Sequence, residues 1–399
     1  MRAIVLSGGG AKGSYEIGVW KALRKLNINY DIVTGTSVGA LNGALMVQKD
    51  YLKALFLWYN LNYDDIFEIK KDYTKEDINK LYKEGILKGG VDVTNLENTI
   101  KKYINPKKFF KSNIKYGLIT VKFPSLKHVE MTKEKLNKQN LSDYLVASAS
   151  CFPAFKLKKI DKEYYIDGGF YDNMPINLAV KMGATEVIAV DLDEIGIKRN
   201  LKYDVDVTYI SPKNKIDSFL TFEKNSSRRG IRLGYNDTMK QYKKLDGNMY
   251  TFKLNDLENN FLKNKEKYLE NIKNVIKNDS IILENIVLKK ILKNDVILKN
   301  KINEIIEKLG YLYKIDDSNI YSIKKYNNMI LKKINKTKLN LNIESINKDK
   351  IKILFNEELM VKYLYELLVN KKNKKLKKLC IIYPSEFLMA IYIKTIKGD

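Results

Sequence analysis

Short runs of apolar residues alternate with stretches of helical spacing through the first half of the chain. The apolar runs that predict strands lie at residues 2–6, 31–34, 164–166, 186–191 and 207–210. Residues 13–26 and 38–48, which follow the first two runs, repeat their apolar positions at helical spacing. Strands that alternate with helices are typical of an α/β unit. The pattern therefore predicts an α/β fold for this part of the chain.

Helical spacing dominates the chain beyond residue 255. Apolar residues between 282 and 309 recur at i, i+3 and i+4, which predicts a long helical stretch. Asp295 falls inside this stretch and is expected to interrupt it locally, and Gly310 is expected to end it. The second part of the chain is therefore predicted to be mainly helical.

Glycine usage places a boundary between the two parts. Of the 21 glycines only Gly310 and Gly398 lie beyond residue 254, together with one of the six prolines. We therefore expect an α/β domain at residues 1–254 and a helical domain of unknown role, rich in Lys, Asn and Ile, at 255–399. This division agrees with the two or three folding units that 399 residues suggest.

Composition restricts the chemistry that the chain can perform. Hydrophobic residues make up 45% of the chain, so a sizeable core can be buried and general disorder is excluded. There is one histidine, His128, and there are two cysteines, Cys151 and Cys380. These residues cannot build a disulfide framework, a structural zinc site or a two-histidine metal motif. We expect no metal and no cofactor, and catalysis that uses one imidazole or none.

No targeting or membrane-spanning segment is evident in the sequence. The apolar run at residues 2–6 is too short for a signal-peptide core. The longest apolar candidate, residues 379–393, is interrupted by Pro384, Ser385 and Glu386 and falls short of the roughly 18 apolar residues that span a bilayer. We therefore expect a cytoplasmic protein that at most associates peripherally with a membrane.

The most specific local motif is a G-x-S-x-G string, residues 35–39, between a predicted strand and a predicted helix. A serine on such a sharp turn is pushed out of the sheet, and the flanking glycines relieve the crowding of the turn. The free N–H groups of the following helix, beginning with Val38, face any oxyanion that forms. Ser37 is therefore the candidate nucleophile, although the same string also occurs as a simple turn.

A glycine-rich loop, residues 7–13, also follows a predicted strand and precedes a helix. Consecutive glycines let backbone N–H groups approach an anion closely. The loop lacks the lysine spacing of a Walker phosphate loop, although its glycines fit the weak G-x-G-x-x-G dinucleotide pattern. An oxyanion hole built from Gly8, Gly9 and Gly10 explains this loop and Ser37 together. We therefore prefer it to the interpretation of the loop as a dinucleotide-binding site.

Asp167 ends a predicted strand and precedes two glycines. Asp-Gly is also common in turns for purely conformational reasons. In combination with Ser37, however, an aspartate at a strand end could take the serine proton directly. Such a pair would need no histidine.

Four strings that occur in this order resemble the patatin-like phospholipase family: GGGAKGSYEIGVW, GTSVGALNGA, SASCFPAF and YYIDGGFYDNMP, which cover about residues 1–195. The resemblance implies a three-layer α/β/α catalytic domain that hydrolyses lipid esters with a Ser-Asp dyad. Ser37 would be the nucleophile and Asp167 its base. Lys12 stands where the family usually has Arg or Lys and is expected to contact substrate. The resemblance does not extend to residues 255–399.

The implied activity is that of a serine lipid acyl hydrolase with an acyl-enzyme on Ser37. An acyltransferase would use the same acyl-enzyme with an acceptor other than water, so the sequence leaves both open. A lipid- or protein-binding module with a decayed site is a third possibility, and the intact Ser37, Asp167 and glycine loop argue against it. Phospholipid, lysophospholipid, neutral glyceride and non-lipid ester all remain possible substrates.

Other reactive residues have simpler explanations in the sequence. His128 lies in an alternating, strand-like stretch, and the dyad does not need it. Cys151 and Cys380 fit packing positions better than reactive ones. Three further aspartates are more readily explained as solvated or helix-capping residues: Asp172, Asp191 and Asp193. Three arginines lie on an expected helix at residues 226–242 and could contact lipid phosphate, although a solvated basic face explains them more readily: Arg228, Arg229 and Arg232.

The chain is strongly basic, with 72 Lys and Arg against 47 Asp and Glu and a formal net charge of +25. Positive charge favours contact with an anionic membrane surface. Lys, Asn and Ile share A/T-rich codons, so genome composition also explains much of this charge. Nucleic-acid binding is not supported, because no nucleic-acid-binding motif is present and residues 253–399 contain no arginine for reading bases.

Overall fold

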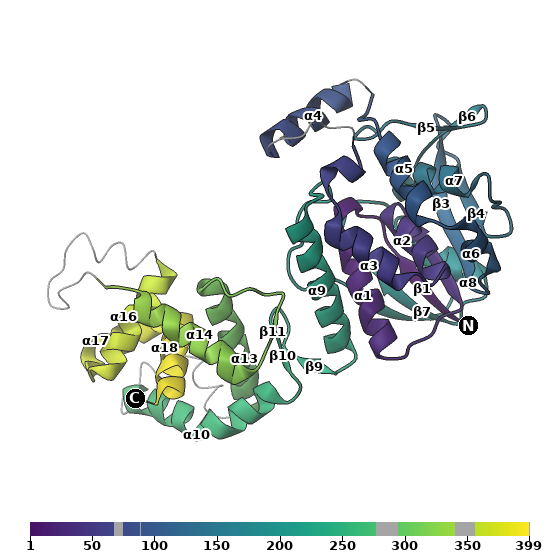
Figure 1. Cartoon of the computed structure of the whole chain (residues 1–399). Coiled ribbons are helices and arrows are strands. Elements are labelled where there is room, and N and C mark those ends of the chain that lie inside the picture. The colour runs from purple at the N-terminus through teal and green to yellow at the C-terminus, as the bar shows by residue number, and fades with distance from the viewer. Residues whose placement is uncertain (68–74, 88, 277–293, 340–355, 399) are drawn as a thin grey trace. The chain divides into compact units, whose positions relative to one another are not determined.

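The computed structural model describes residues 1–67, 75–87, 89–276, 294–339 and 356–398. The chain divides into two compact units, Met1–Gln241 and Tyr242–Asp399 (Figure 1). Among the helices of the described residues, none is both long and apolar enough to cross a bilayer.

The first unit is built on an eight-stranded mixed sheet with the connectivity β5–β6–β3–β2–β1–β7–β8, in which β4 also pairs with β3. Its strands are β1 (Arg2–Leu6), β2 (Ile32–Thr36), β3 (Lys115–Phe123), β4 (His128–Thr132), β5 (Lys158–Ile160), β6 (Glu163–Asp167), β7 (Glu186–Val190) and β8 (Asp206–Ile210). Strands β3, β2, β1, β7 and β8 run parallel, whereas β4 and β6 run antiparallel to β3. The strands predicted near residues 2, 31, 164, 186 and 207 are all present in this sheet.

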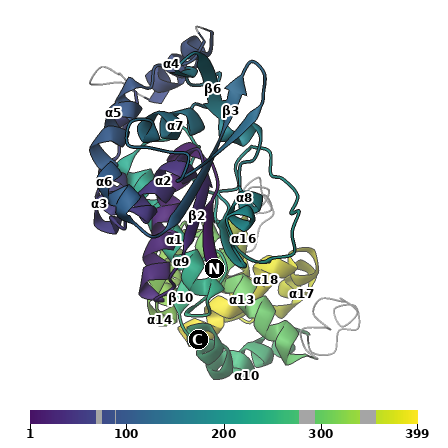
Figure 2. The same cartoon turned by 90° about the vertical axis from the view of Figure 1, so that its right-hand side faces the viewer.

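Helices cover both faces of the sheet, so the expected three-layer α/β/α arrangement is present (Figure 2). The helices are α1 (Ser14–Lys25), α2 (Val38–Val47), α3 (Tyr51–Asn60), α4 (Lys75–Leu87), α5 (Thr94–Tyr103), α6 (Pro106–Lys111), α7 (Leu141–Ser148), α8 (Ile176–Lys181) and α9 (Lys224–Gln241). Alternation along β1 divides its side chains between the layers. Ala3 and Val5 pack with Ile176 and Ala179 in the α8 layer, and α2 and α7 contact the sheet on its opposite face (Figure 2).

Two strands meet end to end along one edge of β3. Ile119 of β3 pairs with Thr36, the last residue of β2, and the next residue, Thr120, pairs with Asp167, the last residue of β6. Strand β4 occupies the other edge of β3 through both positions. Strands β2 and β6 therefore approach each other head to head, which brings the residues at their ends together although about 130 positions separate them in the sequence.

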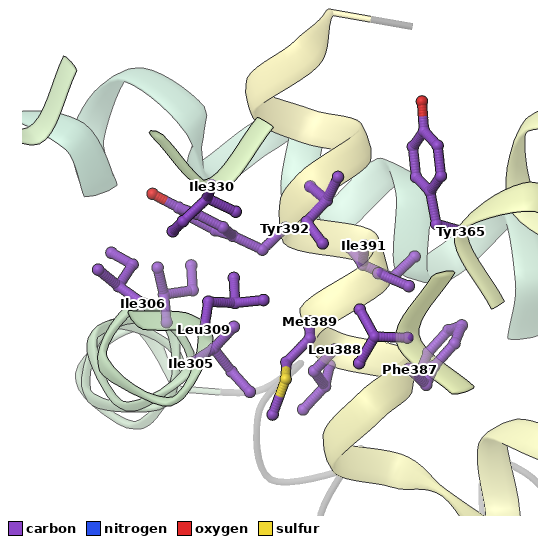
Figure 3. Packing of buried hydrophobic residues seen from close by; sticks show 14 of the residues in the cluster. Ile305, Ile306, Leu309, Ile330, Tyr365, Phe387, Leu388, Met389, Ile391 and Tyr392 are labelled. Atoms are coloured by element: carbon purple, nitrogen blue, oxygen red, sulfur yellow. The ribbon is translucent and has the colours of Figure 1, made fainter. Parts of the chain in front are cut away.

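The second unit is mainly helical, as expected from the sequence. Its helices are α10 (Asp256–Ile276), α13 (Asp295–Leu312), α14 (Ile323–Lys336), α16 (Glu357–Val369), α17 (Asn373–Ile382) and α18 (Pro384–Lys397), and its small sheet contains β9 (Leu245–Asp246), β10 (Thr251–Lys253) and β11 (Ile320–Tyr321). Helix α18 lies at the centre of this unit, because every residue from 387 to 393 is at most 1% exposed. Figure 3 shows Ile305 and Leu309 of α13 facing Met389 of α18.

Helix α18 includes much of the apolar stretch at residues 379–393 that the sequence presented as the longest apolar candidate. A helix that is apolar on all sides is expected in the centre of a helical core, where every face contacts a neighbour. Helices α10, α13, α14, α16 and α17 provide those contacts. The apolarity of this segment is therefore explained by packing within the second unit.

Two details of the predicted organisation were wrong. The division between the units falls after Gln241 and not after residue 254, because β10 pairs with β9 and with β11 and so belongs to the second unit. Gly310 does not end a helix: α13 continues through it to Leu312, and a Cβ at this position would collide with the Tyr326 hydroxyl. The glycine thus serves a close packing contact.

Asp295, expected to interrupt the predicted helical stretch, is the first residue of α13. The side chain of Asn294 caps this helix by accepting hydrogen bonds from the N–H groups of Val296 and Ile297. The part of the stretch at residues 282–293 lies outside the described residues.

Candidate active site

Ser37 occupies a sharp turn between β2 and α2, as the G-x-S-x-G motif predicts. Its backbone has φ 55° and ψ −127°, a conformation that is strained for a residue with a side chain. A Cβ on Gly35 would collide with the carbonyl of Gly39, and a Cβ on Gly39 would lie 2.7 Å from the Leu6 carbonyl carbon. Both glycines are therefore required by close backbone approach. Ser37 as a whole residue is 9% exposed.

Ser148, which the sequence did not single out, supports this turn from α7. Its hydroxyl oxygen accepts a 3.0 Å hydrogen bond from the Ser37 N–H, and its own proton is donated to the Ile119 carbonyl at 2.7 Å. An unpaired buried N–H would be costly, so this hydroxyl stabilises the strained backbone of Ser37. Ser148 lies in the SASCFPAF string, but its contact with Ser37 becomes evident only in the folded chain.

Asp167 lies beside Ser37. The Oδ1 atom of the buried Asp167 carboxylate accepts a hydrogen bond from the Gly169 N–H at 2.7 Å, and the Ser37 side chain lies close enough to favour the charged form of this carboxylate. Burial raises the pKa of Asp167 to about 6, and the hydrogen bonds from Ser37 and Gly169 limit that rise because they favour the charged form. The carboxylate is therefore ionised at neutral pH yet more basic than an exposed aspartate.

The glycine-rich loop lies against Ser37, but one of its predicted donors is already engaged. The Gly8 N–H donates to both the backbone carbonyl and the side-chain Oδ1 of Asn173, each at 3.1 Å. Gly8 is thus not a free oxyanion donor, and its lack of a side chain matters instead, since a Cβ there would lie 3.1 Å from that of Ser37. Asn173 also donates from Nδ2 to the Gly8 carbonyl at 3.4 Å. Asn173, which lies in the YYIDGGFYDNMP string, therefore positions the glycine-rich loop. The sequence alone did not indicate this role.

The other predicted donors remain available for an anion. Within the described part of the chain, the N–H groups of Gly9, Gly10 and Val38 have no hydrogen-bond acceptor. Val38 is the first residue of α2 and Gly10 the first residue of a 3₁₀ turn, positions whose N–H groups have no acceptor inside the helix. Gly10 adopts φ +53°, which favours glycine.

Lys12 is held by acidic neighbours. Its ammonium forms a 2.7 Å ion pair with Glu194 and donates to the Asp193 carbonyl at 3.4 Å. The side chain is 14% exposed. These contacts connect the glycine-rich loop to the segment after β7, so the contact with substrate that the resemblance implied for Lys12 stays a prediction.

A narrow apolar cavity of about 80 Å³ opens beside Ser37. Its walls come from α2, α3, α5 and the segments that flank them, and they include Leu41, Leu45, Leu57, Trp58, Leu61, Ile66, Leu96, Ile100, Ile104, Phe155 and Phe222. Ser37, Gly10 and Val38 also line this cavity. A hydrocarbon chain placed here would bring its carbonyl end close to the hydroxyl of Ser37.

A buried polar network at the wall of this cavity joins three helices. Asn42 of α2 donates to Glu16 of α1 at 2.7 Å, and its side-chain oxygen accepts from the Trp58 indole of α3 at 2.9 Å. Burial raises the pKa of Glu16 well above its usual value, which favours the neutral form of this carboxyl. Its other oxygen, Oε1, has no hydrogen-bond partner among the described residues.

His128 and the two cysteines are not part of the Ser37–Asp167 pair. The exposed imidazole of His128 stacks on Tyr171, with ring centroids 3.8 Å apart. Burial raises the pKa of the Cys151 thiol to about 12, which suppresses thiolate formation. Cys380 is buried in the second unit.

The remaining aspartates and arginines have structural partners. Asp172 is buried, caps the Met174 N–H at 3.2 Å and has a pKa raised to about 7 by burial; it is thus a capping residue and not a solvated one. Asp191 pairs with Lys198 at 2.7 Å and, together with it, orders the turn at Asp193. On α9, Arg228 donates to the Tyr59 carbonyl at 3.2 Å, Arg229 donates to the Lys215 carbonyl at 3.0 Å, and Arg232 also has a partner.

The family comparison agrees with this geometry. Residues 4–180 match the protein-family model described as Patatin-like phospholipase. This part of the chain is similar to patatin-like phospholipases. Strands β2 to β6, Ser37 and Asp167 all lie within the matched residues. In the described part of the chain, no three His, Cys, Asp or Glu side chains gather in an arrangement that could hold a metal ion.

Curated relatives of this patatin-like chain match it over a similar region. Neuropathy target esterase sws of Drosophila melanogaster is 27% identical over 205 residues, and patatin-like phospholipase domain-containing protein 7 of Rattus norvegicus is 29% identical over 194 residues. The matches cover 47% and 48% of this chain but 13% of either relative. Among solved structures, VipD from Legionella pneumophila covers 99% of this chain and 91% of its own, with 14% identity and a TM-score of 0.38, a likeness too weak to support an argument.

Proposed function

We propose that this chain is a serine lipid acyl hydrolase that cleaves fatty-acyl esters through an acyl-enzyme on Ser37. The observation that carries this proposal is the approach of Ser37, on its strained turn, to the buried Asp167 carboxylate, beside an apolar cavity that Ser37 lines. The names of the curated relatives, an esterase and a phospholipase-domain protein, agree with an ester of a lipid as substrate.

The first half of the proposed reaction forms the acyl-enzyme. Asp167 accepts the Ser37 proton while Oγ attacks the ester carbonyl, and the carbonyl π electrons move to its oxygen. The N–H groups of Gly9, Gly10 and Val38 stabilise this oxyanion. The tetrahedral intermediate then collapses, the ester C–O bond breaks, and Asp167 returns the proton to the departing alcohol.

The second half releases the fatty acid. Asp167 accepts a proton from a water molecule as that water attacks the acyl carbonyl, and the same N–H groups stabilise the second oxyanion. Collapse breaks the bond between the acyl carbon and Ser37 Oγ, which recovers the proton from Asp167. The products are a free fatty acid and an alcohol, and no cofactor is consumed.

The apolar cavity explains why we assign a lipid and not a small polar ester. Its walls offer hydrocarbon and aromatic side chains on three helices, and burial of an acyl chain there contributes about 0.8 kcal/mol for each CH₂ group. An apolar acyl group gains this binding energy, whereas a small polar ester does not. We also infer that such a substrate is presented by a lipid surface, with which the basic chain associates peripherally.

The deciding experiment compares wild type with Ser37→Ala on a mixed lipid extract, with released fatty acids identified by mass spectrometry. We expect the variant to lose activity by roughly 10³-fold or more, because the nucleophile is removed. A fluorophosphonate probe should label wild type and not the variant. Equal fatty-acid release by the two proteins would refute the assignment of Ser37.

A further inference from the structure

Helix α3 connects the cavity beside Ser37 with the outer surface of the first unit. It lies against α1, α2 and α9 (Figure 1). Ala54 and Trp58 face inward and are buried, and Leu57 and Trp58 line the cavity. One wall of the candidate active site is therefore the inner side of a helix whose other side is a surface.

The outer side of α3 carries large apolar side chains where a surface helix usually carries polar ones. Leu52 is 74% exposed, Phe56 63% and Tyr59 39%. Their spacing, i, i+4 and i+7, places them on one face of the helix. We call these three residues the α3 apolar face. An exposed apolar cluster of this kind is typical of a site that contacts a membrane or a partner.

A group of cations adjoins the Leu52 end of this face. A polar hollow of about 450 Å³ is lined by Arg24, Lys49, Lys53 and Lys108, with Asp50 as its one acidic residue. Asp50 forms a 2.7 Å ion pair with Lys108. No ion pair engages Arg24, Lys49 or Lys53 within the described residues, so the hollow keeps a net positive charge.

The Tyr59 end of the α3 apolar face also has a cation. The Arg228 guanidinium lies 5.2 Å from the centre of the Tyr59 ring, and it donates to the Tyr59 carbonyl. Positive charge therefore borders the apolar face at both ends, at the hollow and at Arg228. This arrangement is complementary to a surface that is apolar inside and anionic at its boundary.

We propose that the α3 apolar face docks on an anionic lipid surface. Leu52 and Phe56 enter the boundary between headgroups and acyl chains, while Lys49, Lys53 and Arg228 contact lipid phosphates. Docking by this face brings a cavity wall next to the membrane. That link to Ser37 rests on the proposed function, whereas the docking itself does not.

A fluorescence experiment on the full-length chain reports on this face alone. Both native tryptophans, Trp20 and Trp58, are buried, so Phe56→Trp introduces an exposed reporter. We expect vesicles of phosphatidylcholine with phosphatidylserine to shift its emission to the blue, and vesicles of phosphatidylcholine alone to have a much smaller effect. Leu126→Trp, at a hairpin residue with a similar exposure of 62%, is the matched control and should not shift.

Charge removal tests the second half of the proposal in the Phe56→Trp background. Lys49→Gln with Lys53→Gln should raise the vesicle concentration at half-maximal shift by about tenfold or more, because each lysine near an anionic membrane contributes appreciably to binding. Lys138→Gln with Lys162→Gln removes the same amount of charge from exposed positions elsewhere in the first unit. This control pair should change the vesicle concentration at half-maximal shift far less.

Four results would overturn the proposal: no shift with anionic vesicles, an equal shift at Leu126→Trp, equal effects of the two lysine pairs, or a shift with soluble polyglutamate but not with vesicles. The last result would assign the face to an acidic protein partner. Adding Ser37→Ala to Phe56→Trp should leave the shift intact. If Ser37→Ala also leaves hydrolysis unchanged, the hydrolase assignment fails while the docking assignment stands.

Discussion

The reactivity of the site depends on how readily Asp167 gains and loses a proton. The pKa of this carboxyl is raised to about 6, mainly by burial. Because Asp167 must be ionised to accept the Ser37 proton, we expect kcat/KM for a soluble ester to rise with pH up to about 6 and then to level off. A pH–rate profile of the wild-type chain measures this directly.

Asp172 provides the control for that profile. Its pKa, about 7, is also raised by burial, and it lies close enough to the site for its backbone carbonyl to accept from the Thr36 hydroxyl at 2.7 Å. Asp172→Asn removes this titrating group but keeps a side-chain oxygen that accepts from the Met174 N–H. If Asp167 is the base, the rise in kcat/KM near pH 6 should therefore remain in this variant. If this rise disappears, the titration belongs to Asp172 and the assignment of Asp167 as the base loses its support.

The raised pKa of Asp167 also lowers the stability of the fold above pH 6. A carboxyl whose pKa is higher in the folded than in the unfolded chain contributes most below the unfolded pKa, and the contribution is lost as pH rises through the folded pKa. For Asp167, the rise from 3.8 to about 6 corresponds to roughly 3 kcal/mol lost above pH 6. The buried base is therefore a residue retained at a cost in stability, as expected of a catalytic group.

At the scale of elements, the Glu16–Asn42–Trp58 network fixes how α1, α2 and α3 pack around the cavity. Asn42→Leu leaves both the Trp58 indole and the Glu16 carboxyl without their partner. We expect this variant to lose about 2–4 kcal/mol of unfolding free energy, because buried polar groups would be left unsatisfied. Urea unfolding at constant pH measures the loss.

Glu16→Gln is the matched variant for this network. The glutamine retains an acceptor for Asn42, so its stability at slightly acidic pH should stay within about 1 kcal/mol of wild type. Since the pKa of Glu16 is raised by burial, wild type loses stability as pH rises toward that pKa, and Glu16→Gln should lose less. A loss in Glu16→Gln as large as that in Asn42→Leu would contradict the network.

How far the sequence predicts these elements depends on the range of the contacts involved. Strands β1 and β2, helices α1 and α2, and the sharp turn at Ser37 follow from local spacing and local glycines. The meeting of Ser37 with Asp167 depends on β2 and β6 sharing one edge of β3, which no local pattern encodes. Ser148 and Asn173 were not predicted for the same reason, because they contact the site from segments that are distant in the sequence. Gly310 was misread because glycine also serves close packing inside a helix.

At the scale of the whole molecule, the position of the boundary between the two units has a testable consequence. The residues of the dyad, the glycine-rich loop and the cavity all belong to the unit Met1–Gln241. Beyond it, β10 pairs with β9 on one edge and with β11 on the other, and Phe252 of β10 is fully buried in the core of the second unit. A chain that ends at residue 241 therefore omits no part of the site. A chain that ends at residue 254 retains β10 without its partner β11.

We expect the chain ending at Gln241 to be monomeric and to hydrolyse a soluble short-chain ester with a kcat/KM close to that of the full chain. The chain ending at residue 254 should associate or aggregate, because Phe252 and the unpaired edge of β10 become exposed. Size-exclusion chromatography and ester hydrolysis compare the two, with Ser37→Ala in the shorter chain as the blank. If the longer chain is the well-behaved one and the shorter chain fails to fold, residues 242–254 belong to the first unit after all, and the boundary predicted from glycine usage is the correct one.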